Sequence, residues 1–241
     1  MIGYNKEQIE TLIQDINRSY TSIGNCMAEG WPNLSATMEA EWVGPDEVSY
    51  ETELAKNICE LYVKCDEVVV GMMTNISKLG ENWINFQKNN IMTDADAVTN
   101  FFDGISIATS DVVVDLPSTV KAGSPTFSAS TNMGLTNGTE SGTKIKTVFD
   151  AYIDSVYDKV KELYNAFDSS KAFLGSELNS KVNEYLAQMG EALAKLTSCH
   201  KSIYDALDQL IARYATHESE EATNVSGAAG DGINFNGQNL K

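Results

Sequence analysis

The sequence predicts a mainly α-helical protein: long antiparallel helical hairpins that form a four-helix bundle, with a small β-containing insert in the middle. Three observations lead to this prediction. Apolar residues recur at intervals of three and four over long stretches, which is the spacing of one helix face. Only four prolines occur in 241 residues, and the long stretch after Pro125 has none, which favours helix because proline interrupts the helical hydrogen-bond ladder. The middle of the chain is instead rich in serine, threonine, glycine and asparagine.

Residues 1–90 are predicted to form the first hairpin. Asn5 and the glutamine three positions later make a capping box that opens a helix. An apolar stripe follows, and Pro32 predicts a kink between a helix over residues 5–29 and a shorter helix over residues 33–41. The stripe resumes in phase after the kink, so the apolar face is expected to continue.

The first hairpin is predicted to turn at Trp42 and Gly44. Glycine suits the C-terminal cap of one helix, and Pro45 suits the first turn of the next. A further apolar stripe then predicts a helix over residues 47–90, roughly 65 Å long at about 1.5 Å per residue. A helix of this length needs an antiparallel partner, which residues 5–41 supply.

Residues 91–143 are predicted to form an insert of different character. A cap followed by a turn signal indicates a short helix over about residues 93–102. Small polar residues dominate residues 118–143, which is typical of a loop. Between them, β-branched residues indicate short strands: Ile105, Ile107, Val112, Val113 and Val114. A hinge or an exposed tip is the default interpretation of this insert.

Residues 144–218 are predicted to form a second helical hairpin. Its two apolar stripes are separated by a break at Phe173 and Gly175, which we interpret as a possible second turn. The remaining residues, 219–241, are polar and rich in glycine, and they are expected to form a flexible tail.

The charge balance excludes some classes of partner. Seventeen basic residues face 34 acidic ones, a net charge of −17, so neither nucleic acid nor an acidic membrane surface is expected to bind. Most of this charge lies before residue 144, and we interpret it as solvated helix faces and loop. The most apolar run, residues 68–73, is far shorter than the ~20 residues that span a bilayer, so no stable membrane insertion is expected.

The sequence offers little chemistry for catalysis. The cysteines are scattered without a C-x-x-C pair, so we interpret them as small buried thiols. The two histidines lack partners at metal-ligand spacing, and neither a glycine-rich phosphate loop nor a nucleophile elbow is present. We therefore expect no metal, no cofactor and no enzymatic activity. The residues concerned are Cys26, Cys59, Cys65, Cys199, His200 and His217.

The Trp42-Val43-Gly44 turn between two long helices resembles that of the WXG family, the early-secreted-antigen-like substrates of type VII secretion. Asp46 and Tyr50 match the acidic and aromatic positions that often follow the family's turn. Members of the family are helical hairpins that pair as antiparallel four-helix dimers. The resemblance covers the first hairpin directly, and the alternative interpretation is a tryptophan that caps the core of any helical hairpin.

The family's second mark is a Tyr-x-x-x-Asp/Glu element near the end of a hairpin, which acts in export. Tyr214 and Glu218 match this element where the last stripe ends, and the resemblance implies that they are a possible export signal. The same spacing also arises between ordinary neighbours on a helix. It recurs at Tyr62/Asp66, Tyr164/Asp168 and Tyr204/Asp208.

The second hairpin departs from the family because Phe173 stands where the tryptophan belongs. We nevertheless expect a tandem fusion of two hairpins, since each hairpin alone leaves an apolar stripe uncovered. In family dimers the turn of one subunit and the export element of the other can lie side by side. By analogy, Trp42 and Gly44 of the first hairpin would meet Tyr214 and Glu218 of the second. Either a monomeric fused bundle or a homo-oligomer fits this prediction.

The leading functional hypothesis is a non-enzymatic protein exported by a type VII-like secretion system, acting as a helical adaptor or structural effector. Its expected partners are the secretion ATPase or a partner helical-hairpin protein. The start of the chain lacks a basic flank followed by an apolar run, so export is expected by a signal-peptide-independent route. The protein would be cytoplasmic before export and secreted or cell-surface afterwards.

Two other functions stay open. One is a structural subunit of a phage particle or surface filament. The other is an α-helical pore-forming toxin with residues 104–116 as a β-tongue, although Asp111 and Asp115 in this segment would be costly inside a bilayer.

Overall fold

The computed structural model of the chain describes residues 6–90 and 134–230. Within them lie four long helices and two short strands. In chain order these are α1 (Lys6–Glu41), β1 (Trp42–Val43), α2 (Pro45–Asn90), β2 (Gly134–Leu135), α5 (Thr139–Ser170) and α6 (Ser176–Gly230). The short helix and the strands expected between residues 93 and 114 lie outside the described residues.

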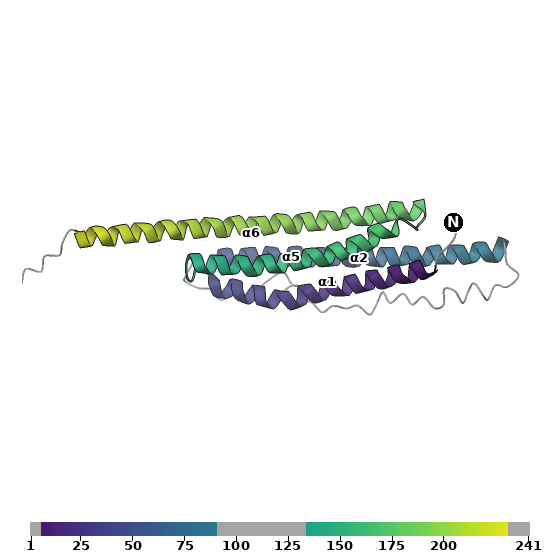
Figure 1. Cartoon of the computed structure of the whole chain (residues 1–241), viewed down its shortest axis with the longest axis horizontal. Helices are drawn as coiled ribbons and strands as arrows, with labels where there is room; N and C mark the ends of the chain where they lie inside the picture. Colours follow the sequence, from purple (N-terminus) through teal and green to yellow (C-terminus); the bar gives the residue numbers. More distant parts are fainter. Residues whose placement is uncertain (1–5, 91–133, 231–241) are drawn as a thin grey trace, which may run out of the picture.

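The helices form an elongated four-helix bundle (Figure 1). α1 and α2 make the first hairpin, and α5 and α6 make the second. α1 packs antiparallel along α5, and α2 packs antiparallel along α6, so these two contacts join the hairpins to each other. The turns of the two hairpins lie at opposite ends of the bundle (Figure 1). The predicted fold class, antiparallel hairpins in a four-helix bundle, is therefore confirmed.

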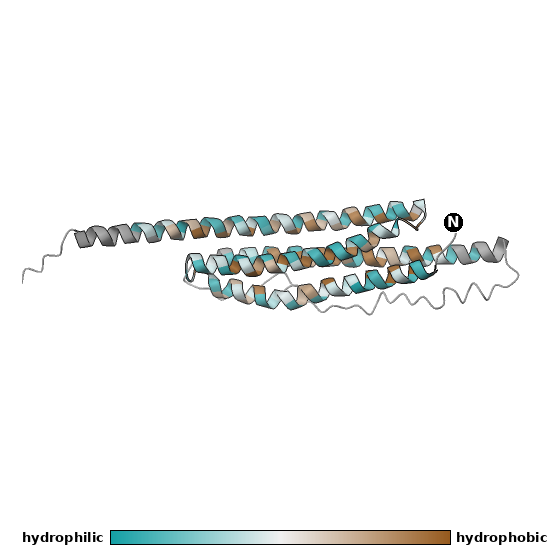
Figure 2. Ribbon diagram, viewed as in Figure 1, coloured by the Kyte–Doolittle hydropathy of each residue, from teal (hydrophilic) through white to brown (hydrophobic). Residues whose placement is uncertain are grey.

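The apolar stripes form one continuous core along the bundle. Figure 2 shows both apolar and polar residues on each helix, in the parts that it colours. The largest fully buried side chains include Trp42, Phe149 and Phe167. Burial of one such side chain stabilises the fold by about 1.5–3 kcal/mol, so packing between helices, rather than helix propensity, holds the bundle together.

α1 runs without a break through Pro32, so the predicted division into two helices is wrong. Pro32 lies on the exposed face, whereas Trp31 and Leu34 on either side of it are buried in the core. Packing of these neighbours holds both halves of the helix against the core, and the helix continues through the proline. Figure 1 shows α1 as a single curved helix, and a bend is the usual response to an internal proline.

The outer boundaries of the second hairpin also differ from those expected. α5 begins at Thr139, before the predicted start at residue 144. α6 continues to Gly230, so residues 219–230 of the expected flexible tail are helical and extend beyond the bundle (Figure 1). This segment contains glutamate and alanine, which favour helix, and no proline interrupts it.

The β structure joins the first turn to the insert. β1 and β2 pair antiparallel, with Trp42 opposite Leu135 and Val43 opposite Gly134. The insert thus contributes a strand, but that strand pairs with the turn of the first hairpin. Gly44, with a φ of +136°, completes the turn in a conformation that favours glycine. Among the described helices, none has the length and apolarity needed to cross a membrane.

Candidate functional site at the Trp42 end of the bundle

Trp42 is the anchor of the first turn. Its side chain is 1% exposed, and its ring lies 5.4 Å from the ring of Tyr50. The indole Nε1–H is buried without a hydrogen-bond partner among the described residues. The indole therefore holds the turn through packing area and aromatic contact rather than through its polar group.

Tyr214 of α6 reaches the same end of the bundle. Its hydroxyl oxygen accepts a hydrogen bond from the Leu135 backbone N–H at 3.0 Å. Because Leu135 is the ladder partner of Trp42, a single residue of β2 connects the first turn to the last helix. Trp42, Gly44 and Tyr214 thus belong to one site, with β2 between them. Glu218 follows one turn later on α6, and its side chain lies outside the described part of the chain, as does that of Asp46.

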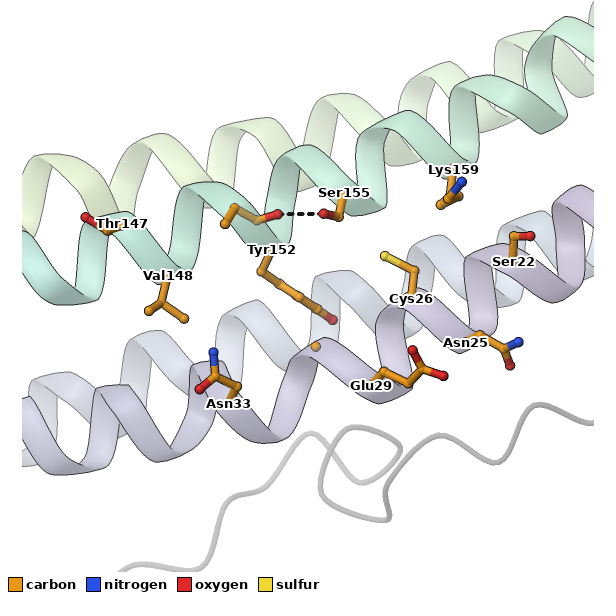
Figure 3. A pocket seen from close by; sticks show the side chains of 12 residues that line it. Ser22, Asn25, Cys26, Glu29, Asn33, Thr147, Val148, Tyr152, Ser155 and Lys159 are labelled. Carbon is orange, nitrogen blue, oxygen red and sulfur yellow. Dashed lines mark hydrogen bonds between the residues drawn. The ribbon is translucent and has the colours of Figure 1, made fainter.

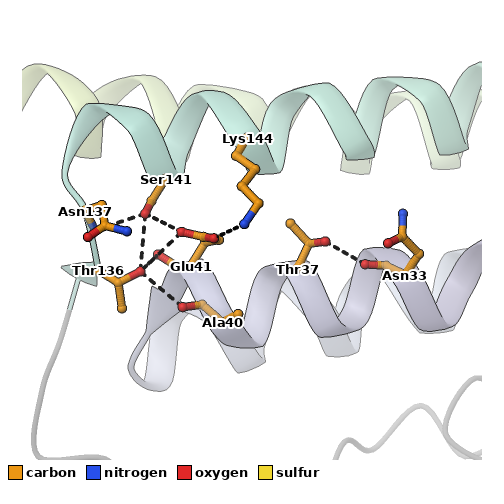
Figure 4. A network of polar contacts seen from close by, with 8 residues as sticks. All are labelled: Asn33, Thr37, Ala40, Glu41, Thr136, Asn137, Ser141 and Lys144. Atoms are coloured by element: carbon orange, nitrogen blue, oxygen red, sulfur yellow. Dashed lines mark hydrogen bonds and ion pairs between the residues drawn. The ribbon is translucent and has the colours of Figure 1, made fainter.

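A polar network fastens the insert to the C-terminal end of α1 (Figure 4). The Thr136 N–H donates to the Glu41 carbonyl at 3.0 Å, and the Thr136 hydroxyl donates to the Ala40 carbonyl at 3.1 Å. These bonds satisfy carbonyl groups that a helix end leaves without partners. A residue far along the chain therefore caps α1.

The Glu41 side chain extends this network to α5 (Figure 4). Its carboxylate accepts a hydrogen bond from the buried Ser141 hydroxyl at 2.6 Å and forms an ion pair with Lys144. The hydrogen bonds from Lys144 and Ser141 lower the pKa of the Glu41 carboxyl, since they favour its charged form. The carboxylate also lies near the first turn of α5, where negative charge suits the helix dipole.

A pair of buried carboxyl groups lies just after the turn. Glu47 and Glu51 are one helical turn apart on α2, 4% and 2% exposed, and the Ser35 hydroxyl donates to Glu51 Oε1 at 2.5 Å. Burial, together with the nearby charges of Glu51 and Glu39, raises the pKa of Glu47 to about 8. Burial also raises the pKa of Glu51. Both shifts favour a protonated carboxyl within the pair.

The possible second turn differs from the first. Unlike Gly44, Gly175 does not have a positive φ, and a Cβ added to it would meet nothing within 4 Å. Phe173 is only half-buried, and Leu174 is the buried residue of this turn. The turn is made by hydrogen bonds from the Phe173 and Leu174 N–H groups to the Ser170 carbonyl. It lies at the opposite end of the bundle from Trp42 (Figure 1).

The remaining candidates for chemistry are dispersed. The described cysteines form no disulfide. Cys65 and Cys199 are buried, as predicted, and burial raises their pKa values to about 12 and 11, whereas Cys26 and Cys59 are only partly buried. His200 Nε2 lies 3.0 Å from Asp150 Oδ1, between α5 and α6. In the described ranges, no group of three or more His, Cys, Asp or Glu side chains is placed to hold a metal ion.

An open groove of roughly 760 Å³ runs between α1 and α5 (Figure 3). Its lining combines hydroxyl and amide side chains with a larger apolar surface, with Cys26 on one wall and Lys159 on the other. Tyr152 crosses the groove and donates its hydroxyl to the Met27 carbonyl at 3.2 Å. The ring thereby fills the space between α1 and α5 at this point.

Several residues of the Trp42 site were not anticipated from the sequence. Leu135, Thr136 and Ser141 lie in a stretch that is typical of a loop, and Glu41 has the appearance of an exposed residue at a helix end. The pattern of small polar residues does not reveal that they pack against the turn.

Comparison with known proteins gives no further assignment. No protein-family model, no curated protein and no solved structure is significantly similar to the chain. The class that the fold and site define is a bundle of two antiparallel helical hairpins whose first turn is joined to the last helix through a short strand.

Proposed function

We propose that the chain is a non-enzymatic protein exported by a type VII-like secretion system, in which it acts as a helical adaptor or structural effector. One observation carries the proposal: Trp42 of the first turn and Tyr214 of the last helix meet on the same residue of β2. The WXG resemblance implies an export element composed of the turn of one hairpin and the tyrosine of the other.

The arrangement of the hairpins supports the same proposal. Each hairpin presents an apolar face to the other, and their turns point to opposite ends, as expected for two family subunits fused in tandem. The partner would be the secretion ATPase, which would bind at the Trp42 end before export. The protein would start in the cytoplasm and finish outside the cell or on its surface.

The test is fractionation of cells with and without the secretion ATPase. We expect the protein in the supernatant only when the ATPase is present. Tyr214→Ala should remain in the cells, whereas Tyr164→Ala should be exported normally. Tyr164 is the matched control because it has the same Tyr-x-x-x-Asp spacing and is 36% exposed, but lies on α5.

Circular dichroism of the purified variants separates a loss of export from a loss of fold. Tyr214→Phe provides a second check on whether an export defect comes from loss of fold, because it keeps the ring and removes only the hydroxyl. Equal export with and without the ATPase, or normal export of folded Tyr214→Ala, contradicts the proposal. The pore-forming alternative depends on residues 104–116, which lie outside the described residues. Rings or fibres of purified protein in electron micrographs would favour the phage or filament alternative.

A further inference from the structure

Gly134 lies directly against the phenol of Tyr214. A Cβ atom at Gly134 would come within 1.9 Å of the Tyr214 hydroxyl oxygen and 3.1 Å of Cζ. Gly134 also has a φ of +120°, a conformation that other residues rarely adopt. The absence of a side chain therefore lets β2 cover the end of the tyrosine.

The next residue of β2 completes this contact. The Leu135 N–H donates to the Tyr214 hydroxyl, and the Leu135 side chain is 5% exposed. Gly142 leaves space on α5 that is filled by Ile211 of α6 and by Leu135, because a Cβ there would lie 2.6 Å and 3.2 Å from their side chains. β2 is thus held between α5 and α6 as well as by β1.

The third anchor of this segment is independent of Tyr214. Thr136 caps the end of α1 through its N–H and its hydroxyl, with donor–acceptor distances of 3.0 and 3.1 Å. Loss of the Thr136 hydrogen bonds to α1 would release β2 without altering Tyr214. The structure therefore offers two separate ways to uncover Tyr214.

We infer that β2 masks Tyr214, so that a partner which binds the tyrosine hydroxyl must first displace β2 from β1 and α6. The partner is the secretion ATPase, and this part of the inference rests on the proposed function. Leu135 N–H and a partner donor would compete for the same hydroxyl oxygen. Docking of β2 and recognition of Tyr214 then compete with each other.

The test compares Gly134→Ala and Thr136→Val with Gly190→Ala in the full chain. Gly134→Ala introduces the clash with Tyr214, Thr136→Val removes the hydroxyl bonds to the end of α1, and Gly190 has open space around its Cβ position. We expect hydrogen exchange of the Leu135 amide to accelerate about tenfold in the first two variants, because both weaken the partly buried hydrogen bond from Leu135 to Tyr214. Nitration of Tyr214 by tetranitromethane should approach the rate of Tyr164. The exported fraction should rise together with the nitration rate. Gly190→Ala should change neither the exchange rate of the Leu135 amide, nor the nitration rate of Tyr214, nor the exported fraction.

The outcomes separate the inference from the proposed function. In one outcome the loosened variants exchange and nitrate faster, but their export is unchanged or reduced, and Tyr214→Ala still blocks export. This outcome overturns masking and leaves the proposed function standing. Unchanged nitration of Tyr214 in both loosened variants also overturns masking. Normal export of Tyr214→Ala contradicts the proposed function, and nitration then still decides whether β2 covers the tyrosine. If Gly134→Ala does not fold, Thr136→Val decides the outcome.

Discussion

Gly30 of α1 lies beneath the ring of Tyr152 on α5, where a Cβ atom would come within 2.5 Å of the ring carbon Cδ2. The absence of a side chain at this position lets the tyrosine cross the groove and donate its hydroxyl to α1. Similar close approaches join the two parts of the chain elsewhere, at Gly71 with Tyr185 and at Gly134 with Tyr214. In each pair a glycine before residue 135 accommodates a tyrosine of the second hairpin.

Gly30→Ala should destabilise the protein by about 1–3 kcal/mol, because the added methyl group overpacks against the buried ring of Tyr152. Gly190→Ala on α6 is the matched control, since a Cβ there meets nothing within 4 Å. That substitution should stabilise the protein by about 0.5–1 kcal/mol, the usual helix-propensity gain. Urea unfolding followed by circular dichroism measures both. A neutral Gly30→Ala would show that Tyr152 shifts freely.

Glu47→Gln should flatten the pH dependence of stability between pH 4.5 and 8. The pKa of Glu47 is raised from 4.5 to about 8 in the folded protein, so the native state retains a proton that the unfolded chain loses. The stabilising contribution is full below pH 4.5 and is lost as the pH rises through 8. We expect a loss of about 1–2 kcal/mol in the wild type, after allowance for solvent screening.

The measurement is the free energy of unfolding at pH 5 and pH 8. Glu81→Gln, an exposed position on the same helix, should leave the wild-type slope unchanged. A wild-type stability that rises between these two pH values, with Glu47→Gln behaving identically, would contradict a shared proton in the Glu47–Glu51 pair.

Ser141→Ala should destabilise the Trp42 end by about 1–3 kcal/mol, because the buried hydroxyl both donates to Glu41 and accepts the Asn137 N–H. Ser155→Ala is the control, since that exposed hydroxyl bonds only to its own helix among the contacts described. Thermal unfolding of the two variants should differ accordingly. Equal melting temperatures would argue that water replaces the Ser141 bonds.

The lowered pKa of the Glu41 carboxyl predicts that the Trp42 end of the bundle loses stability in acid. Its pKa is held below 4.5 in the folded protein, so its contribution to stability is full above pH 4.5 and is lost as the pH falls through the folded value. Hydrogen exchange of the Thr136 amide should accelerate in this acidic range after correction for the intrinsic rate. Lys144→Met, which removes the ion-pair partner, should move the transition to higher pH. An unmoved transition would exclude Lys144 as its cause.

Trp42→Ala should cost about 3–5 kcal/mol, because it leaves a cavity at a residue that is 1% exposed. Trp42→Phe should cost only about 1–2 kcal/mol. It loses part of the packing area but also removes an indole N–H that has no partner among the described residues. Urea unfolding of both variants tests this difference. Equal costs would indicate that the indole N–H does bind a partner.

The sequence predicted the helices well because a helix face is a local, periodic signal. Ile16, Ile23 and Phe167 all lie in the predicted apolar stripes, and all are buried. The first turn was predictable as well, since Gly44 suits the C-terminal end of one helix and Pro45 the first turn of the next. Pro32 misled the prediction because its effect depends on tertiary packing, and the neighbouring Trp31 and Leu34 keep the helix continuous.

The contacts that complete the candidate site were not predictable by the same reasoning. β2 is only two residues long and has no periodicity, and its partner β1 lies on the other side of the insert. Glu47 and Glu51 have the spacing of an exposed charged face, yet both are buried where the hairpin folds back. Such features depend on which segments meet in space, and a single sequence does not encode that in its local pattern.

The two hairpins bury their apolar faces mainly against each other, α1 on α5 and α2 on α6, although they belong to one covalent chain. Two separate hairpins with this interface would associate only above a threshold set by their dissociation constant. Joined through residues 91–133, they meet at an effective concentration fixed by the connection, not by the amount of protein present. The assembly is therefore insensitive to dilution, and its unfolding midpoint should not depend on protein concentration.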